Sequence, residues 1–92
     1  MASVLCERVA RGLRESEVIA AIRDFYGRKH DIRVERDFLH LRGGQSYLPV
    51  EIVHIDPQSK AVLIELPHEA ETGANRLWVP GGNFLDPVCV PA

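Results

Sequence analysis

Two sets of apolar residues recur at helical spacing before Asp31. The first set is Leu5, Val9 and Leu13, and the second is Val18, Ile19, Ile22, Phe25 and Tyr26. Recurrence every three or four residues is typical of an amphipathic helix. Gly12 lies just before the break between the sets, and Gly27 followed by basic residues is a typical helix C-terminus. The pattern therefore predicts a helical segment over 3–30, with a short helix over 3–12 and a firmer one over 16–28.

Apolar and polar residues alternate after Asp31, as expected for strands. The clearest element is a β-hairpin of strands 47–55 and 61–66. Its turn contains Asp56 and Pro57, because proline fixes φ and the aspartate can accept a backbone hydrogen bond. A phase slip at 36–37 predicts a bulge or bend. Further short strands are expected at 76–79 and 88–90.

These elements predict one α+β domain over 1–92. The helical segment is followed, over 31–90, by a small, strongly bent antiparallel β-sheet or barrel. About five short strands have to curl in order to cover a core of this size. The element order resembles an SH3-like or Sm-like barrel, with a long first loop, a central hairpin, a short fourth strand and a terminal strand. The resemblance concerns element order alone, and no functional residue follows from it.

The composition is that of a soluble globular protein with one core. The chain has 92 residues, of which 46% are hydrophobic and 26% are charged. No apolar run is long enough for a membrane span, and we expect a cytoplasmic protein without a membrane partner. Residues 1–46 carry nine Lys and Arg against seven Asp and Glu, and residues 47–92 carry two against six. This mild asymmetry differs from the concentrated basic face of nucleic-acid-binding proteins, so a nucleic-acid partner is not favoured.

The chemistry-bearing residues show no arrangement typical of catalysis. The two cysteines, Cys6 and Cys89, lie near opposite ends of the chain and are expected to be reduced thiols, although a bridge between them stays open. The four histidines and the cysteines lack the spacing of metal ligands. The sequence predicts no catalytic residue, no metal site and no cofactor.

One weak constellation of aromatic and basic residues indicates a binding surface. Trp78 lies between two aliphatic residues, so either its own side chain or theirs faces outward, and both orientations remain open. An outward tryptophan is typical of an interface. Tyr47 follows a glycine-containing loop and could share a surface with Arg42 or Arg76, since arginine stacks on aromatic rings. We therefore expect Arg42, Tyr47, Arg76 and Trp78 to bind a partner.

The first apolar stripe predicts self-association. Leu5, Val9 and Leu13 are out of phase with the apolar face of the helix expected over 16–28. One end of a small barrel would not cover both stripes, and a second copy of the chain would cover the first. These three residues are thus the expected interface of a homo-oligomer, most simply a dimer.

The leading functional hypothesis is a non-enzymatic protein-binding or interaction module that presents 42–47, 67–76 and the Trp78 strand. One alternative is a small-barrel protein that binds RNA or single-stranded DNA, which requires Arg33, Arg36, Arg42 and Arg76 to share a face. Another alternative is a small enzyme with a pocket between subunits, which requires the histidines to line that pocket.

Overall fold

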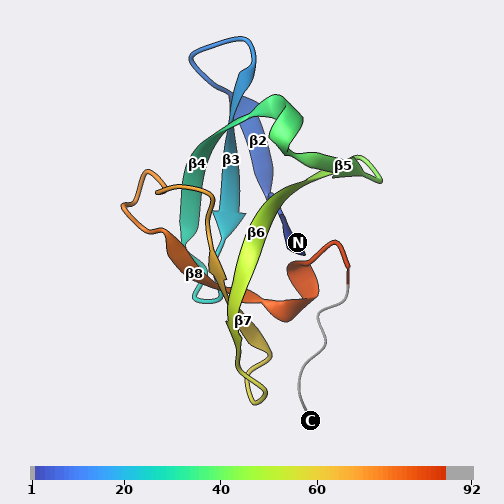
Figure 1. Ribbon diagram of the computed structural model, residues 1–92, viewed down its shortest axis with the longest axis vertical. Helices are drawn as coiled ribbons and strands as arrows, with labels where there is room; N and C mark the ends of the chain where they lie inside the picture. Colours follow the sequence, from blue (N-terminus) through green and yellow to red (C-terminus); the bar gives the residue numbers. More distant parts are fainter. Residues whose placement is uncertain (1, 87–92) are drawn as a thin grey trace.

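The computed structural model describes residues 2–86, and in this range the regular structure is almost entirely β-strand (Figure 1). The strands are β1 (Ala2–Leu5), β2 (Arg8–Arg11), β3 (Glu17–Arg23), β4 (Lys29–Glu35), β5 (His40–Arg42), β6 (Gln45–Ile55), β7 (Ala61–Glu65) and β8 (Arg76–Pro80). Two short 3-10 helices, η1 (Arg36–Phe38) and η2 (Gly81–Asn83), follow β4 and β8. Across 2–86, no helix has the length and apolar character needed to cross a membrane.

The strands form two antiparallel sheets. One sheet has three strands in the order β2–β3–β4, and the other has the order β1–β6–β7–β8 with β5 also paired to β6. The long strand β6 pairs with β1 and β5 near its start and with β7 near its end, where the register shifts between Ile52 and His54. The described strands do not close into a barrel, so the predicted barrel is wrong.

A bend at Cys6 and Glu7 connects the two sheets. The Cys6 N–H donates to the Ser46 carbonyl at 2.9 Å, which extends the β1–β6 ladder by one residue. The Glu7 N–H instead donates to the Ala21 carbonyl at 2.8 Å, which starts the β2–β3 ladder. The chain therefore leaves one sheet and enters the other within two residues, and β2 diverges from the start of β6.

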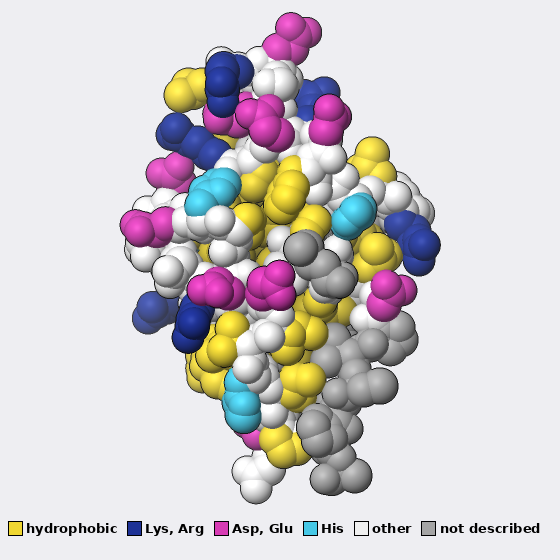
Figure 2. Space-filling model, viewed as in Figure 1, with side chains coloured by type: hydrophobic (Ala, Val, Ile, Leu, Met, Phe, Trp, Pro, Cys, Tyr) yellow, Lys and Arg dark blue, Asp and Glu magenta, His cyan; other side chains and the backbone are white. Residues whose placement is uncertain are grey.

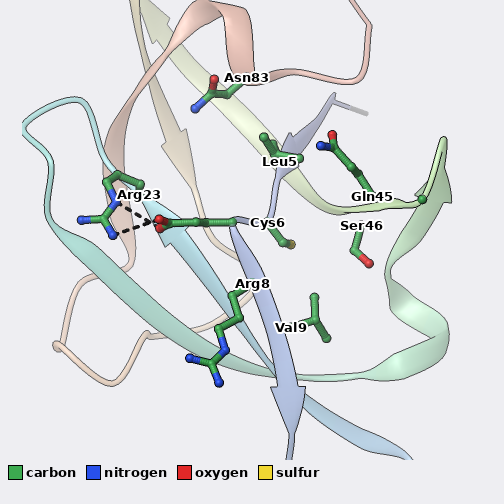
Figure 3. Close-up of a pocket in the computed structure, with 10 residues that line it drawn as sticks. Leu5, Cys6, Arg8, Val9, Arg23, Gln45, Ser46 and Asn83 are labelled. Atoms are coloured by element: carbon green, nitrogen blue, oxygen red, sulfur yellow. Dashed lines mark hydrogen bonds and ion pairs between the residues drawn. The ribbon is translucent and has the colours of Figure 1, made fainter.

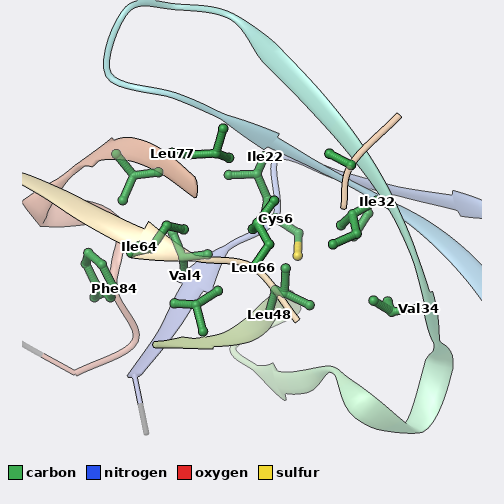
Figure 4. Packing of buried hydrophobic residues seen from close by; sticks show 14 of the residues in the cluster. Val4, Cys6, Ile22, Ile32, Val34, Leu48, Ile64, Leu66, Leu77 and Phe84 are labelled. Carbon is green, nitrogen blue, oxygen red and sulfur yellow. The ribbon is translucent and has the colours of Figure 1, made fainter. Parts of the chain in front are cut away.

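The core lies between the sheets. Its residues alternate with outward-facing ones in β4 and β8, whereas β3 and β6 each bury three residues in a row. The most deeply buried side chains are Val4, Ile22, Ile32, Leu48, Val62, Ile64 and Val79. Figure 4 shows side chains from both sheets meeting around Cys6. Burial of this apolar area is the main stabilising contribution, at about 25 cal/mol per Å².

The prediction of a helical segment over 3–30 is wrong, because β1, β2, β3 and the start of β4 occupy that range. In β3 the core-facing residues Val18, Ala20 and Ile22 are buried at a spacing of two, and Ala21 on the other face is buried as well. A separation of four residues between Val18 and Ile22 fits a helix, but it also fits a strand when the residue between them is buried. The small Ala20 carries no strong pattern signal, so the alternation is hidden in the sequence.

The other helix signals belong to a hairpin turn. Phe25 and Tyr26, assigned to the apolar helix face, are exposed at the tip of the β3–β4 hairpin. Gly27, interpreted as a helix stop, has a φ of 85° in that turn, a conformation that glycine adopts without strain. The Asp24 carboxylate accepts hydrogen bonds from the N–H groups of Tyr26 and Arg28, both at 2.9 Å. Turn residues and helix ends share these features.

The strand predictions are closer to the structure. The central hairpin is confirmed as β6–β7, with Ile52 directly opposite Ile64. Its turn forms as expected, since the Asp56 carboxylate accepts a hydrogen bond from the Gln58 N–H at 3.1 Å. Where a bulge or bend is predicted at 36–37, β4 ends and η1 begins, so the strand is interrupted there by a short 3-10 helix and not by a bulge. The predicted strand at 88–90 lies outside the described residues.

Candidate functional site

A groove runs along the free side of β2, and we call it the β2 groove. It has two parts, of about 550 Å³ and 260 Å³, which share Val9 and Ser46. One wall is β1–β2, and the other wall comes from η1, the residue after it, and the β5–β6 hairpin. The lining includes Leu5, Cys6, Arg8, Val9, Ala10, Arg11, Arg36, Leu39, Leu41, Gln45 and Ser46. In Figure 3, Val9 and Ser46 lie on the same side of the β2 ribbon, and Arg8 and Arg23 lie on the other.

Val9 marks a place where the core is left uncovered. It lies opposite Ala20, which in turn lies opposite Ile32, so all three side chains face the core side of their sheet. Ala20 and Ile32 are buried, whereas Val9 is 38% exposed. The reason is positional: Val9 is on the edge strand, and the other sheet diverges from β2 after Cys6. The groove floor is thus an open end of the hydrophobic core.

The backbone of β2 has a free hydrogen-bonding edge. Antiparallel partners alternate between hydrogen-bonded and non-hydrogen-bonded pairs. Since the Gly12 N–H donates to the Glu17 carbonyl at 3.0 Å, Ala10 also bonds to β3, and the N–H and C=O groups of Val9 and Arg11 point to the opposite side. No backbone hydrogen bond between described residues occupies that side. Such an edge is a template for another strand.

The groove is flanked by positive charge. Arg8, Arg11 and Arg36 make no ion pair with any residue in 2–86. Glu7, the acidic residue among the described residues that line the groove, is bound by Arg23 through two hydrogen bonds of 3.0 Å (Figure 3). The hydrogen bond from Arg23 holds the pKa of Glu7 below its usual value. The free cations make the groove attractive to an acidic ligand.

Cys6 lies at the base of the groove and is not equipped for nucleophilic chemistry. Its side chain is buried and unbridged, and burial raises the pKa of its thiol to about 12. The thiolate is the reactive form, so this cysteine is inert at neutral pH. Its possible partner Cys89 lies outside the described residues.

A hydrogen-bonded chain, the His30 clasp, links the buried residues Asp24 and His30 to the exposed Thr72. His30 Nε2 lies 2.8 Å from Asp24 Oδ2, and Nδ1 lies 2.7 Å from Thr72 Oγ1. Because a carboxylate only accepts, Nε2 donates to Asp24, and Nδ1 is paired with the Thr72 hydroxyl. Both ring nitrogens are thereby occupied, so the clasp fixes the structure and has no free group for a substrate.

The His30 clasp attaches the 67–75 loop to β4. Alongside it, the Glu71 N–H donates to the Asp31 carbonyl at 2.8 Å, and Arg33 pairs with the Glu71 carboxylate at 3.0 Å. Burial raises the pKa of Asp24, but hydrogen bonds from His30 and from two backbone N–H groups outweigh it and leave that pKa below its usual value. Sequence reasoning missed this cluster, because a contact between 24, 30 and 72 has no local signal.

The structure separates the four expected binding residues into two pairs. Arg42 and Tyr47 lie in the β5–β6 hairpin, and the Tyr47 hydroxyl donates to Gln45 Oε1 at 3.3 Å. Arg76 and Trp78 lie on β8, where Arg76 Nε is 3.7 Å from Glu65 Oε1. Trp78 lies opposite Leu63 of β7, which lies opposite His54 near the end of β6, whereas Tyr47 is near the start of β6. The two pairs therefore do not meet.

Trp78 faces away from the core. Its neighbours Leu77 and Val79 are buried, and Trp78 itself is half-buried. Its ring lies 6.1 Å from the His54 ring in a perpendicular arrangement. His54, Leu63 and Trp78 are directly opposite one another on three strands, so they form one outward-facing row.

The expected oligomer residues follow one edge of the molecule instead of one helix face. Leu5 and Val9 line the β2 groove. Leu13 is 83% exposed in the turn between β2 and β3. None of the three is fully buried, so all remain available for contact with a partner.

The residues required by the alternative functions are dispersed. Arg33 lies on β4 of one sheet and is paired with Glu71, and Arg76 lies on β8 of the other sheet and is paired with Glu65. The two arginines therefore do not join Arg36 and Arg42 on one basic face. His54 lies against Trp78, and His30 is buried in its clasp. Over 2–86, no group of three or more His, Cys, Asp or Glu side chains is arranged to hold a metal ion.

Comparisons with protein-family models, with curated proteins and with solved structures find no match.

Proposed function

We propose that this protein is a non-enzymatic module that binds an extended acidic segment of a partner protein as an additional strand on β2. The exposure of Val9 supports the proposal most directly, because this side chain faces the core side of its sheet and is nevertheless 38% exposed. An added strand would extend β2–β3–β4 and cover the open end of the core. Strand addition to an exposed sheet edge is a common mode of peptide recognition.

Each part of the groove would contribute a different component of recognition. The free N–H and C=O groups of Val9 and Arg11 would supply backbone hydrogen bonds, which are independent of the ligand sequence. Val9 and Leu39 would contact apolar side chains on the inner face of the added strand. Arg8, Arg11 and Arg36 would favour carboxylates along it.

The test uses two synthetic peptides of alternating residues, one of valine and glutamate and one of valine and lysine. We expect the glutamate peptide to bind, the lysine peptide not to bind, and the affinity to fall with added salt. Strand addition also predicts that the amide protons of Val9 and Arg11 become protected from hydrogen exchange when the peptide is added. Absence of binding at millimolar peptide, or binding without this protection, would contradict the proposal.

Two valines provide a matched pair of variants. Val9 and Val53 have nearly equal exposure, 38% and 41%, but only Val9 lines the β2 groove. Val9→Asp places a carboxylate where the acidic peptide would lie, and it should abolish binding. Val53→Asp introduces the same charge on β6 and should leave binding unchanged. Equal effects of both substitutions would show that the peptide does not use the groove.

A further inference from the structure

A second groove, distinct from the β2 groove, lies between η1 and the 67–75 loop, and we call it the acidic groove. The residues that line it include Phe38, Glu51, Glu65, Pro67, His68 and Glu69. Phe38 is 41% exposed. Figure 2 shows hydrophobic side chains in the middle of one face, bordered by acidic ones. None of the described residues that line this groove is Lys or Arg.

The charges of the acidic groove are incompletely neutralised. Glu51 lies directly opposite Glu65 on the neighbouring strand, and like charges in this position destabilise a sheet. Glu65 has Arg76 at 3.7 Å, whereas Glu51 and Glu69 make no ion pair with any residue in 2–86. A cation placed beside Glu51 from outside would relieve this repulsion.

The β5–β6 hairpin of the same chain presents the complementary surface. Leu41, the middle residue of β5, is 79% exposed. Arg42 follows it and makes no ion pair with any described residue. Residues 40–46 contain no Asp or Glu. The hairpin projects sideways from the body in Figure 1.

We propose that the acidic groove receives Leu41 and Arg42 from a second copy of this chain. The Leu41 side chain covers Phe38 and Pro67, and the Arg42 guanidinium binds Glu51 with Glu65 or Glu69. In Figure 2 the hairpin lies at the edge of the same face as the groove. Two copies facing one another around a two-fold axis therefore place each hairpin against the other copy's groove, which gives a closed dimer.

Charge reversal tests this contact by sedimentation velocity up to about 1 mM protein. We expect the wild type to dimerise, and Arg42→Glu and Glu51→Arg each to raise the dissociation constant about tenfold or more. The double variant R42E/E51R should restore dimerisation, because each reversed charge meets the other across the interface. Arg28→Glu, which reverses another exposed cation without an ion pair, is the control and should dimerise as the wild type does.

Three outcomes would overturn the proposal: a wild type that stays monomeric over this range, single variants that dimerise normally, or a double variant that does not recover. The melting temperature of each variant shows whether a loss of dimer comes from unfolding, and the recovery in the double variant excludes a general effect of charge. A dimer that survives R42E and E51R but is lost in Val9→Asp would assign the contact to β2 instead. The peptide test of the β2 groove measures protection of the Val9 and Arg11 amides, so its failure can be distinguished from a failure of this dimer contact.

Discussion

Replacing Ile64 by alanine tests whether the β6–β7–β8 sheet carries the core. Ile64 is fully buried at the centre of β7, directly opposite Ile52 on β6 and Leu77 on β8. The substitution removes about three methylene equivalents, or about 2.4 kcal/mol of transfer free energy at about 0.8 kcal/mol each. The cavity left between two paired strands adds to this cost, so we expect a total of about 4 kcal/mol. That is a large fraction of the free energy of unfolding of a small domain.

Ile52 is the matched control for Ile64. It is the same residue type in the same cross-strand row, but it is 38% exposed where Ile64 is 0% exposed. Ile52→Ala loses only the buried part of the transfer free energy and leaves an opening that water can fill, so we expect about 1.5 kcal/mol. Urea titration followed by circular dichroism measures both values. If the two variants lie within about 1 kcal/mol of each other, burial in this sheet does not set its stability.

Three further predictions follow from single sites. Asp24 has a lowered pKa in the folded protein, so its contribution to stability is present above about pH 3.9 and is lost as the pH falls through the folded value. Urea titrations from pH 7 to pH 2 should therefore show a flatter acid loss for Asp24→Asn, and parallel curves would contradict this. The Cys6 thiol, with a pKa of about 12, should react with a disulfide reagent at neutral pH only when urea unfolds the protein. A Cβ at Gly81 would lie 2.6 Å from the Lys60 carbonyl oxygen, whereas a Cβ at Gly82 has nothing within 4 Å. Gly81→Ala should thus lower the melting temperature and Gly82→Ala should not, and calorimetry distinguishes them.

Local chemistry made the central hairpin predictable. The sequence of β6 alternates over enough residues to show its period, β7 is a short continuous apolar run, and the turn residues Asp56 and Pro57 lie between them. The carboxylate of Asp56 reaches the N–H of Gln58 within the same turn, so no distant residue is needed. The burial of Leu77 and Val79 around an outward Trp78 is different. The sequence allowed both orientations, and pairing with Leu63 and Ile64 on β7 selected one.

Pairing between strands, and not the helical spacing of apolar residues, determined the structure of the first thirty residues. Val18 and Ile22 satisfy both a helical and a strand spacing, and the backbone cost of either conformation is similar. The cross-strand partners Val34 and His30 exist only once β4 folds back on β3. Because β-branched residues pack well against such partners, the strand is the more stable choice. A local sequence pattern does not contain the free energy of packing against these cross-strand partners.

The sequence by itself determined which residues are apolar, which carry charge and where the chain can turn. It thereby indicated Leu5, Val9 and Arg42 as contact residues, but it assigned them to a helix face and to a separate loop. Only the tertiary structure decided that the chain changes sheets at Cys6 and Glu7, which leaves the edge of β2 open beside the β5–β6 hairpin. The physical reason is that an edge is defined by the partner a strand lacks, and that depends on where every other strand has paired.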